Sequence, residues 1–350
     1  MQRLVHMGVP ALLIAGAGVA SAQKITAAGA TFPEPIYTKW FSEYHTAHPE
    51  VQISYTANGS GGGVKGVTDG TVDFGASDVP MTDQELAAAN KKILHFPTVM
   101  GAVVPTYNIP GLSTDLKFSG PLLADIFLGK VAKWNDRAIA AENPGVKLPN
   151  EEIVVVHRTD GSGTTGVFTD YLAKVSPEWK SKVGAAKAVN WPVGVGGPKN
   201  EGVAALVKQT PYSIGYVELT YALQNKMGFG LMKNADGQYV KASAAGVSAA
   251  AAGAAANMPA DFRVSITNAP GKASYPISTF TWMLIPAKIA DPAKATVIKA
   301  FLNWMLTDGQ KDAEGLSYAP LPGAVVTKEK AQLSQVEAPG GGGAKKKGAQ

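Results

Sequence analysis

The stretch HRTDGSGTTGVF, residues 157 to 168, crowds glycine, serine and threonine around a single arginine. The apolar EEIVVVHR that leads into it is typical of a strand, and the VFTDYLAKV that ends it is typical of an amphipathic helix. A strand-to-helix turn leaves backbone N–H groups free at the helix start, where the helix dipole also favours negative charge. The pattern therefore favours an anion site, with a plain tight glycine turn as the alternative.

Two nucleotide-binding motifs share part of this pattern. Gly161, Gly163 and Gly166 satisfy G-x-G-x-x-G, but that fingerprint needs an acidic residue at the end of a second strand about 20 residues further on. The following KVSPEWKSKVGAAKAV contains no such strand. A Walker P-loop needs a lysine before its closing serine or threonine, and this loop has none. We therefore expect no nucleotide and no cofactor.

Two more turns of similar composition stand before helix-like segments, GATFPEP (29–35) and NGSGGGVKG (58–66). Glycine lets the backbone approach an oxyanion closely, while serine and threonine add hydroxyl donors. Pro33 suits the first turn of a helix, where its missing N–H costs nothing. Three helix starts that converge on one cleft would enclose a tetrahedral anion.

Asp78, at the end of VDFGASD, is a carboxylate in what is otherwise an anion site. Its local interpretation is a turn residue before Pro80. It gains a role if the ligand carries a proton, because an ionised carboxylate accepts the P–OH hydrogen of phosphate. Sulfate has no proton to give near neutral pH. An unpaired buried acceptor together with like-charge repulsion would then reject sulfate by several kcal/mol.

Short apolar runs alternate with helix-like stretches from Ile25 onward, which predicts an α/β fold with mostly parallel sheets. The expected strands are 51–57, 72–78, 92–109, 152–158, 213–219 and 277–286. The expected helices are 33–48, 63–70, 83–91, 119–130, 166–175, 201–209 and 291–306, with a peripheral alanine-rich helix at 242–256.

The length of 350 residues suits about two domains. Two long apolar segments, near 96–109 and 274–286, would cross between them and leave a cleft. The expected boundaries are 1–22 for a signal peptide, 23–103 and 275–337 for a discontinuous first lobe, 104–274 for the second lobe, and 338–350 for a disordered Gly/Lys tail.

The first 22 residues have the features of a secretory signal: Arg3, the apolar stretch 7–20 and the cleavage-site pattern Ala20-Ser21-Ala22. The alternative is an uncleaved membrane anchor, but the apolar run falls short of the roughly 20 residues that span a bilayer. We therefore expect cleavage after Ala22 and a periplasmic location.

Composition argues against metal and nucleic-acid binding. The chain has no cysteine, and its five histidines show no metal-ligand spacing. The net charge of +5 includes Arg3 and the three lysines of the tail, so about +1 remains for the folded body. That charge is too small for a nucleic-acid-binding face.

Seven segments, in this order, resemble the phosphate-binding proteins of bacterial phosphate-specific ABC transporters, the PstS family. They are ITAAGATFPEPIYTKW, GSGGGVKG, VDFGASDVPMT, FPTVMGAVVPTYNIPGL, FLGKVAKWND, RTDGSGTTGVFTDYL and IGYVELTYA. The resemblance runs from about Ile25 to Val326. It implies a type II periplasmic binding protein fold: two α/β lobes joined by two hinge segments, with dehydrated phosphate in the cleft. It also implies a monomer that delivers phosphate to the membrane permease subunits of an ABC importer.

The same resemblance implies roles for individual residues. The implied phosphate ligands are Thr31, Phe32, Ser60, Asp78, Arg158, Ser162, Gly163 and Thr164. Thr31 and Ser60 would donate through hydroxyl and backbone, and Phe32 through its backbone N–H. Asp78 would accept the phosphate proton, and Asp160 would orient the Arg158 guanidinium. Many relatives carry two serines where this chain has Ser60-Gly61, which leaves the contribution of the Gly61 position open.

Two alternative functions use the same residues. A secreted serine-dependent phosphatase or hydrolase would use Ser162 or Ser60 with His157 as base. Neither serine lies in G-x-S-x-G, and His157, next to Arg158 on a strand, would point to the opposite face. A sulfate- or molybdate-binding protein of the same fold is the other alternative, and Asp78 argues against it. We therefore expect a binding protein and not an enzyme.

Overall fold

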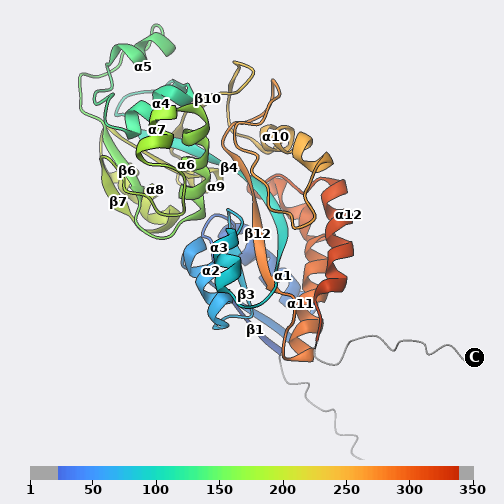
Figure 1. Ribbon diagram of the computed structural model, residues 1–350. Helices are drawn as coiled ribbons and strands as arrows, with labels where there is room; N and C mark the ends of the chain where they lie inside the picture. The colour runs from blue at the N-terminus through green and yellow to red at the C-terminus, as the bar shows by residue number, and fades with distance from the viewer. Residues whose placement is uncertain (1–22, 339–350) are drawn as a thin grey trace, which may run out of the picture.

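The computed structural model describes residues 23–338 and forms two α/β lobes that lie against each other (Figure 1). The expected signal peptide, 1–22, and residues 339–350 of the expected tail lie outside the described residues. Within 23–338, no helix combines the length and the apolar character needed to cross a membrane.

A mixed sheet runs through both lobes in the strand order β2-β1-β3-β12-β4-β8-β6-β7, with β9 paired to β4. Its strands are β1 (Gln23–Gly29), β2 (Val51–Ala57), β3 (Phe74–Ser77), β4 (Ile93–Asn108), β6 (Val154–Arg158), β7 (Val195–Gly197), β8 (Ser213–Glu218), β9 (Gly228–Phe229) and β12 (Ser278–Pro286). A small second sheet contains β5 (Lys117–Phe118), β10 (Leu231–Lys233) and β11 (Tyr239–Val240). β1 runs parallel to β2 and β3, and β6 runs parallel to β7 and β8.

Helices cover the sheet in both lobes (Figure 1). They are α1 (Glu34–Ala47), α2 (Ser60–Asp69), α3 (Asp83–Ala88), α4 (Gly120–Phe127), α5 (Arg137–Glu142), α6 (Gly163–Val175), α7 (Pro177–Lys182), α8 (Lys199–Gln209), α9 (Leu219–Gln224), α10 (Ala244–Ala256), α11 (Pro292–Met305) and α12 (Gly323–Gln332). Three short 3₁₀ helices follow α11 and α12, at Gly309–Asp312, Glu314–Leu316 and Leu333–Gln335. The expected α/β fold is confirmed.

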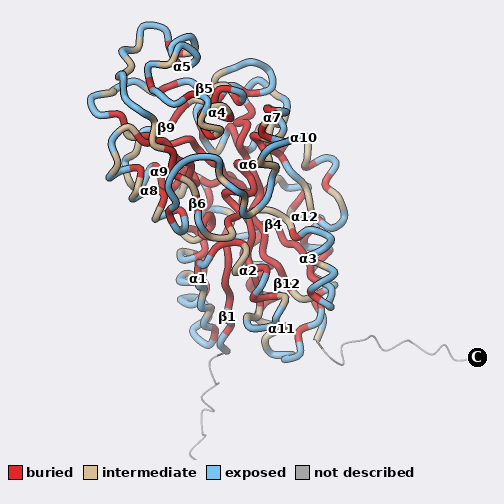
Figure 2. Tube along the Cα trace, turned by 60° about the vertical axis from the view of Figure 1, so that its left-hand side comes forward, coloured by how far each residue is buried: buried red, intermediate tan, exposed pale blue. Residues whose placement is uncertain are grey.

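Strand β4 belongs to both lobes. Its residues 93–102 pair with β12, and its residues 103–108 pair with β8. Every residue of β4 except the last is buried, as Figure 2 shows along the middle of the molecule. A continuous apolar run of this kind is typical of a strand covered on both faces. The chain therefore passes from one lobe to the other at residues 102 and 103.

The return to the first lobe was expected near 274–286. Strand β12 itself stays in the first lobe, because it pairs with residues 93–102 of β4 along its length and with β3 at residues 282–284. Helix α10 packs on β4, β12 and α12, so it is grouped here with the first lobe. The segment 265–274 after it is bonded to Asp170, Lys174 and Asn234 of the second lobe. The alanine-rich sequence predicts a helix but not its packing partner, because small side chains suit any flat apolar surface. Hereafter, the first lobe means residues 23–102 and 244–338, and the second lobe means 103–243.

Aromatic packing fixes the helices that carry the anion-site loops. In the first lobe, Phe41 of α1 packs against Tyr55 of β2 and Phe301 of α11. In the second lobe, the rings of Phe168 on α6 and Tyr216 on β8 are stacked with centroids 4.3 Å apart. Such pairs add about 1 kcal/mol beyond the area that they bury. The start of each helix is thereby held at the end of the strand beside it.

Two helices begin three residues earlier than the sequence predicts. Helix α2 begins at Ser60 instead of 63, and α6 begins at Gly163 instead of 166. The glycines suggested turns, but they form the first helical turn in each case. Ser162 caps α6, since its Oγ accepts from the N–H of Thr165 at 3.0 Å. The free N–H groups of the helix start therefore belong to the glycine-rich segment itself.

Candidate functional site

The carboxyl ends of the parallel strands in both lobes face the boundary between the lobes (Figure 1). Strands β1 and β2 lead to the starts of α1 and α2 in the first lobe. Strands β6 and β7 lead to the starts of α6 and α8 in the second lobe. In open α/β sheets this edge is where ligands bind. Four helix starts thus converge on one place, one more than the sequence predicts.

The loops of the two lobes touch there. The N–H of Gly61 donates to the carbonyl of Gly161 at 2.7 Å. A Cβ on Gly61 would lie 3.2 Å from the Cα and the carbonyl oxygen of Gly161. A Cβ on Gly163 would lie 2.5 Å from Asp78 Oδ2 and closer still to Ser60 Oγ. The lobes are therefore closed on each other, and glycine permits the close approach.

Asp78 lies at the centre of this contact and is 1% exposed. Its Oδ1 accepts from Thr281 Oγ1 at 2.9 Å, and Ser60 Oγ lies 3.4 Å from its Oδ2. Burial raises the pKa of Asp78 to about 7, and the Thr281 hydrogen bond and the charge of Arg158 limit the rise. The carboxylate is thus a buried acceptor whose Oδ2 is only weakly engaged.

The Arg158 side chain is 1% exposed and is held from both sides. Its Nε donates to Asp160 Oδ1 at 2.7 Å, and its Nη1 donates to Thr164 Oγ1 at 3.3 Å. Asp160 Oδ1 also accepts from the N–H of Lys199 at 2.9 Å, at the start of α8. Burial alone would raise the pKa of Asp160, but the hydrogen bonds and charge of Arg158 hold it below its ordinary value. Arg158 therefore presents a charge that Asp160 largely neutralises.

The start of α6 supplies donors from the second lobe. The backbone N–H groups of Gly163 and Thr164 are in the first turn, where no carbonyl of the helix can accept them. The N–H of Ser162 is already used, because it donates to the carbonyl of Lys187 at 2.8 Å. The Ser162 hydroxyl accepts from Thr165, which leaves its own hydrogen available to donate.

Thr31 and Phe32 lie between β1 and α1 and are buried. The Phe32 ring packs against Tyr318 and against Gly101, where a Cβ would collide with it. The carbonyls of Thr31 and Phe32 accept from the hydroxyls of Tyr221 and Tyr318, each at 2.6 Å. Phe32 can therefore contribute only through its backbone.

The structure brings the eight expected ligand residues together, and all eight are buried at the contact between the lobes. Two further buried residues belong to the same network and were missed. Thr281 bonds Asp78 from β12, and Asn200 bonds Thr31 and Thr164 from the start of α8. The available signal for a fourth helix start was Gly196-Gly197-Pro198, directly before α8. No local pattern marks Thr281, which lies 203 residues from its partner.

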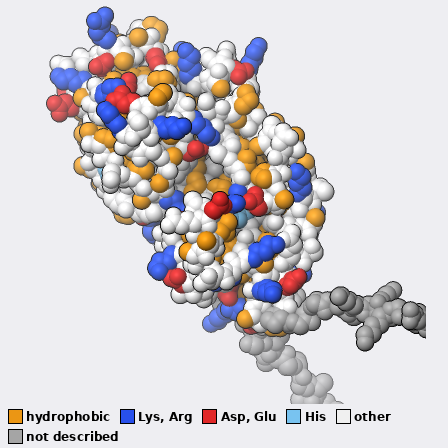
Figure 3. All heavy atoms as spheres, in the orientation of Figure 1, with side chains coloured by type: hydrophobic (Ala, Val, Ile, Leu, Met, Phe, Trp, Pro, Cys, Tyr) orange, Lys and Arg blue, Asp and Glu red, His pale blue; other side chains and the backbone are white. Residues whose placement is uncertain are grey.

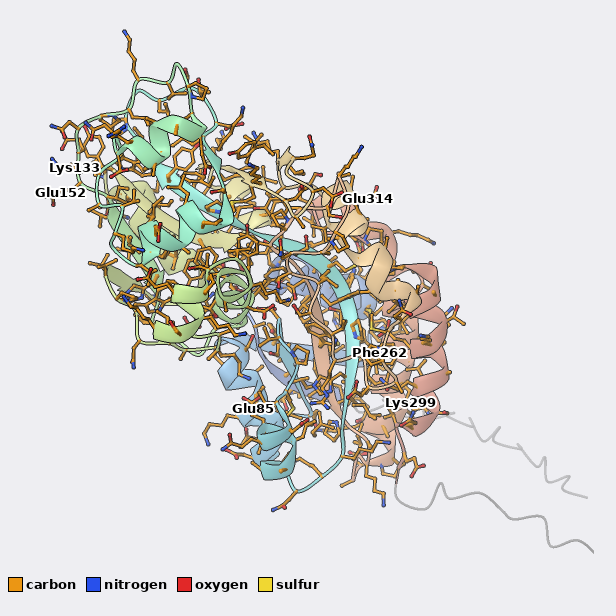
Figure 4. The ribbon with its side chains drawn as sticks, turned by 45° about the horizontal axis from the view of Figure 1, so that its top comes forward. Glu85, Lys133, Glu152, Phe262, Lys299 and Glu314 are labelled. Carbon is orange, nitrogen blue, oxygen red and sulfur yellow. The ribbon has the colours of Figure 1, made fainter. Side chains whose placement is uncertain are left out.

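A cleft of about 480 Å³ borders the site, and Figure 3 shows the hollow between the lobes on this face. Asp78, Gly166, Thr279 and Trp282 are among the residues that line it. The cleft is bridged by an ion pair between Lys187 Nζ of the second lobe and Glu85 Oε1 of the first, 2.5 Å apart. Figure 4 shows Glu85 on α3 at this end, whereas Lys133 and Glu152 lie at the far end of the second lobe.

His157 forms no catalytic pair with the serines of the site among residues 23–338. His157 stacks on Trp191, with ring centroids 4.9 Å apart, and its Nδ1 lies 3.1 Å from the carbonyl of Arg158. No hydrogen bond among residues 23–338 joins it to Ser60 or Ser162. The described part of the chain also contains no group of three or more His, Cys, Asp or Glu side chains that could hold a metal ion.

The fold defines a two-lobed binding protein of the periplasmic type, with buried hydrogen-bond donors gathered where its lobes meet. Residues 15–309 match the family model of the PBP superfamily domain. The phosphate-binding protein PstS of Xylella fastidiosa strain Temecula1 is 47% identical over 300 residues, which cover 85% of this chain and 82% of that protein. The phosphate-binding protein PstS of Methanocaldococcus jannaschii is 42% identical over 309 residues, covering 82% and 79%.

The chain therefore belongs to the PBP superfamily and, within it, to the PstS phosphate-binding protein family. This confirms the resemblance carried by the sequence motifs. A solved phosphate-binding protein from Stenotrophomonas maltophilia has a TM-score of 0.67 at 18% identity, covering 89% of this chain and 94% of that one. That likeness concerns the fold alone.

Proposed function

We propose that this chain is an extracytoplasmic solute-binding protein that captures inorganic phosphate and delivers it to the membrane permease of an ABC importer. Its PstS relatives support the proposal at the level of the family. The observation that carries it at the level of chemistry is Asp78, a buried acceptor among groups that otherwise donate. A small oxyanion with one proton matches that arrangement.

The proposed ligands divide between the lobes. From the first lobe, Thr31 and Ser60 donate through hydroxyl and backbone, and Phe32 donates through its N–H. From the second lobe, the donors are the Arg158 guanidinium, the Ser162 hydroxyl and the first-turn N–H groups at Gly163 and Thr164. Helix starts favour an anion because their N–H groups and dipoles both point at it. Either lobe alone offers only part of the proposed set of phosphate ligands.

Asp78 makes the proposed site selective for phosphate over sulfate or molybdate. Phosphate near neutral pH always keeps a proton that the ionised carboxylate can accept. Sulfate would leave the carboxylate unpaired beside a like charge in a buried site. Sites that bury an unpaired polar group in this way reject the wrong ligand by about 10⁴-fold or more. A sulfate-binding site would place a donor where Asp78 lies.

We propose that no bond is broken at this site. Nucleophilic catalysis by serine needs a base within hydrogen-bond reach. His157 is instead stacked on Trp191, and the Ser162 hydroxyl caps α6. These contacts support binding without turnover, against the alternative of a serine-dependent phosphatase.

Closure of the lobes is proposed to link binding to delivery. The proposed hinges are the connection at residues 102–103 and the return of the chain before β12. The hydrogen bond of Gly61 with Gly161 joins the two lobes in the closed form. We further propose that the chain is a monomer in the periplasm, released by cleavage after Ala22, and that the closed form docks on the permease subunits.

Calorimetric titration of the purified mature chain tests the proposal. Phosphate should bind with one site per chain, and sulfate at a hundredfold excess should leave the phosphate affinity within about twofold. An activated phosphate ester should not be turned over. Tight sulfate binding, or turnover that is lost in Ser162→Ala, would reject phosphate capture as the function.

A further inference from the structure

Asn200 is completely buried at the start of α8 and its amide orientation is determined by its neighbours. Its Oδ1 accepts from the backbone N–H of Glu218 at 3.0 Å. A backbone N–H can only donate, so the atom facing it must be the oxygen. The amide nitrogen, with its two hydrogens, therefore faces the anion site.

Those two hydrogens go to one threonine from each lobe. Asn200 Nδ2 donates to Thr31 Oγ1 at 2.8 Å and to Thr164 Oγ1 at 3.2 Å. Thr31 lies in the first lobe, whereas Thr164 begins α6 in the second. One side chain thus joins the two lobes through two proposed ligands.

Both threonine hydroxyls are saturated as acceptors. Thr31 Oγ1 also accepts from the backbone N–H of Asn200 at 3.3 Å, and Thr164 Oγ1 also accepts from Arg158 Nη1 at 3.3 Å. A hydroxyl has two lone pairs and one hydrogen. With both lone pairs occupied, each hydroxyl can only donate its hydrogen to a further partner, which is what an anion needs.

We infer that Asn200 is a positioning residue that fixes the hydroxyls of Thr31 and Thr164 as donors toward the anion, one from each lobe. Asn200 does not itself touch the ligand. It complements Asp78, because two hydroxyls are held as donors while the carboxylate remains the acceptor. Its hydrogen bond to Thr31 crosses the lobe boundary, so the same side chain orients a ligand and stabilises the closed form. The inference rests on the proposed phosphate site.

A double-mutant cycle separates this role from simple packing. Asn200→Leu keeps the shape but removes every hydrogen bond of the amide. In the parent chain it should weaken phosphate binding about 30-fold, because two donors lose their orientation. In the Thr31→Val/Thr164→Val background, where no hydroxyl remains to be oriented, it should cost less than about threefold. Equal losses in the two backgrounds would overturn the inference.

Asn200→Asp provides a second, independent readout. A carboxylate at this position accepts from both hydroxyls and turns them away from the ligand. Although aspartate is nearly isosteric with asparagine, phosphate affinity should fall at least tenfold further than in Asn200→Leu. A loss no larger than that of the leucine variant would contradict the role. If Asn200→Leu does not fold, Asn200→Ala, which also removes the amide but has a smaller side chain, takes its place in the cycle.

Asn143→Leu is the matched control. Asn143 is also buried and bonds both the N–H and the carbonyl of Lys117, away from the cleft. Its replacement should lower the unfolding temperature and leave phosphate affinity unchanged. The parent chain is titrated alongside with phosphate and with sulfate. If the parent fails to bind phosphate, the proposed function is wrong. If the parent binds phosphate but Asn200→Leu costs the same in both backgrounds, the role of Asn200 is wrong.

Discussion

An alanine at position 163 would put a methyl group where the two lobes touch. Its Cβ would lie 2.5 Å from Asp78 Oδ2, 2.8 Å from Asp78 Cβ and closer still to Ser60 Oγ, all in the opposite lobe. Ordinary contact needs more than 3.4 Å, so the lobes would have to stay about 1 Å further apart. Overpacking a close contact costs about 1–3 kcal/mol, so we expect closure on phosphate to weaken by up to about 100-fold. At 1.4 kcal/mol per factor of ten, this is about 2.8 kcal/mol of binding free energy.

The same change should be harmless within the second lobe, since Gly163 is the first residue of α6 and alanine favours helix. Phosphate affinity measured by calorimetry should therefore fall by up to about 100-fold while the unfolding temperature without phosphate is unchanged or raised. Small-angle scattering should show no compaction on adding phosphate. Gly253→Ala, in α10 with open space around the new methyl group, is the control. Compaction and affinity within about threefold of the parent would refute the closed-lobe reasoning.

Three further results are expected. Burial raises the pKa of Asp78 to about 7, so its carboxyl gains a proton below that pH and can donate to sulfate. The affinity of sulfate as a competitor should therefore rise about tenfold from pH 8 to pH 6. A sulfate affinity that does not change with pH would contradict this. Burial raises the pKa of Glu329 well above its ordinary value, and neither of its carboxyl oxygens has a hydrogen-bond partner among residues 23–338. The fold therefore loses stability as the pH rises above about 4.5. Glu329→Met should therefore gain about 2 kcal/mol in urea unfolding at pH 8 and almost nothing near pH 4, whereas exposed Glu314→Met should change little; no gain at pH 8 would refute it. Since Asp160 neutralises Arg158, phosphate affinity should change less than about threefold between 0.05 and 0.5 M NaCl. A steep fall of affinity with salt would mean that net charge, and not neutral donors, provides most of the binding free energy.

Local patterns predicted the parts of the site that are contiguous in sequence. The loop from Arg158 to Thr164 stands at a strand-to-helix junction, as its composition indicates, and Asp78 drew attention because a carboxylate conflicts with an anion site. Strand β1 was not among the predicted strands, since QKITAAG is rich in alanine and glycine. It is stabilised by pairing on both sides, with β2 and β3, which no local pattern reveals.

Contacts between distant residues could not be predicted. Asn200 and Thr31 are 169 residues apart, and their hydrogen bond exists only because the lobes close. The position of α10 was missed for a related reason, because an alanine-rich helix carries no side chains that specify a partner. The second crossing was expected near 274–286, but β12 pairs with first-lobe residues of β4 and with β3. Hydrophobic periodicity predicts such a strand but not the lobe that it joins.

The ratio of phosphate to sulfate affinity, measured at pH 8 for the parent and for Asp78→Asn in parallel, tests whether Asp78 recognises the proton of the ligand. The carboxylate accepts the phosphate proton, whereas the asparagine amide can donate to sulfate as well. We expect a ratio of about 10⁴ or more in the parent and a fall of at least about 100-fold in the variant. An unchanged ratio would mean that Asp78 does not accept the proton of phosphate and that selectivity has another origin.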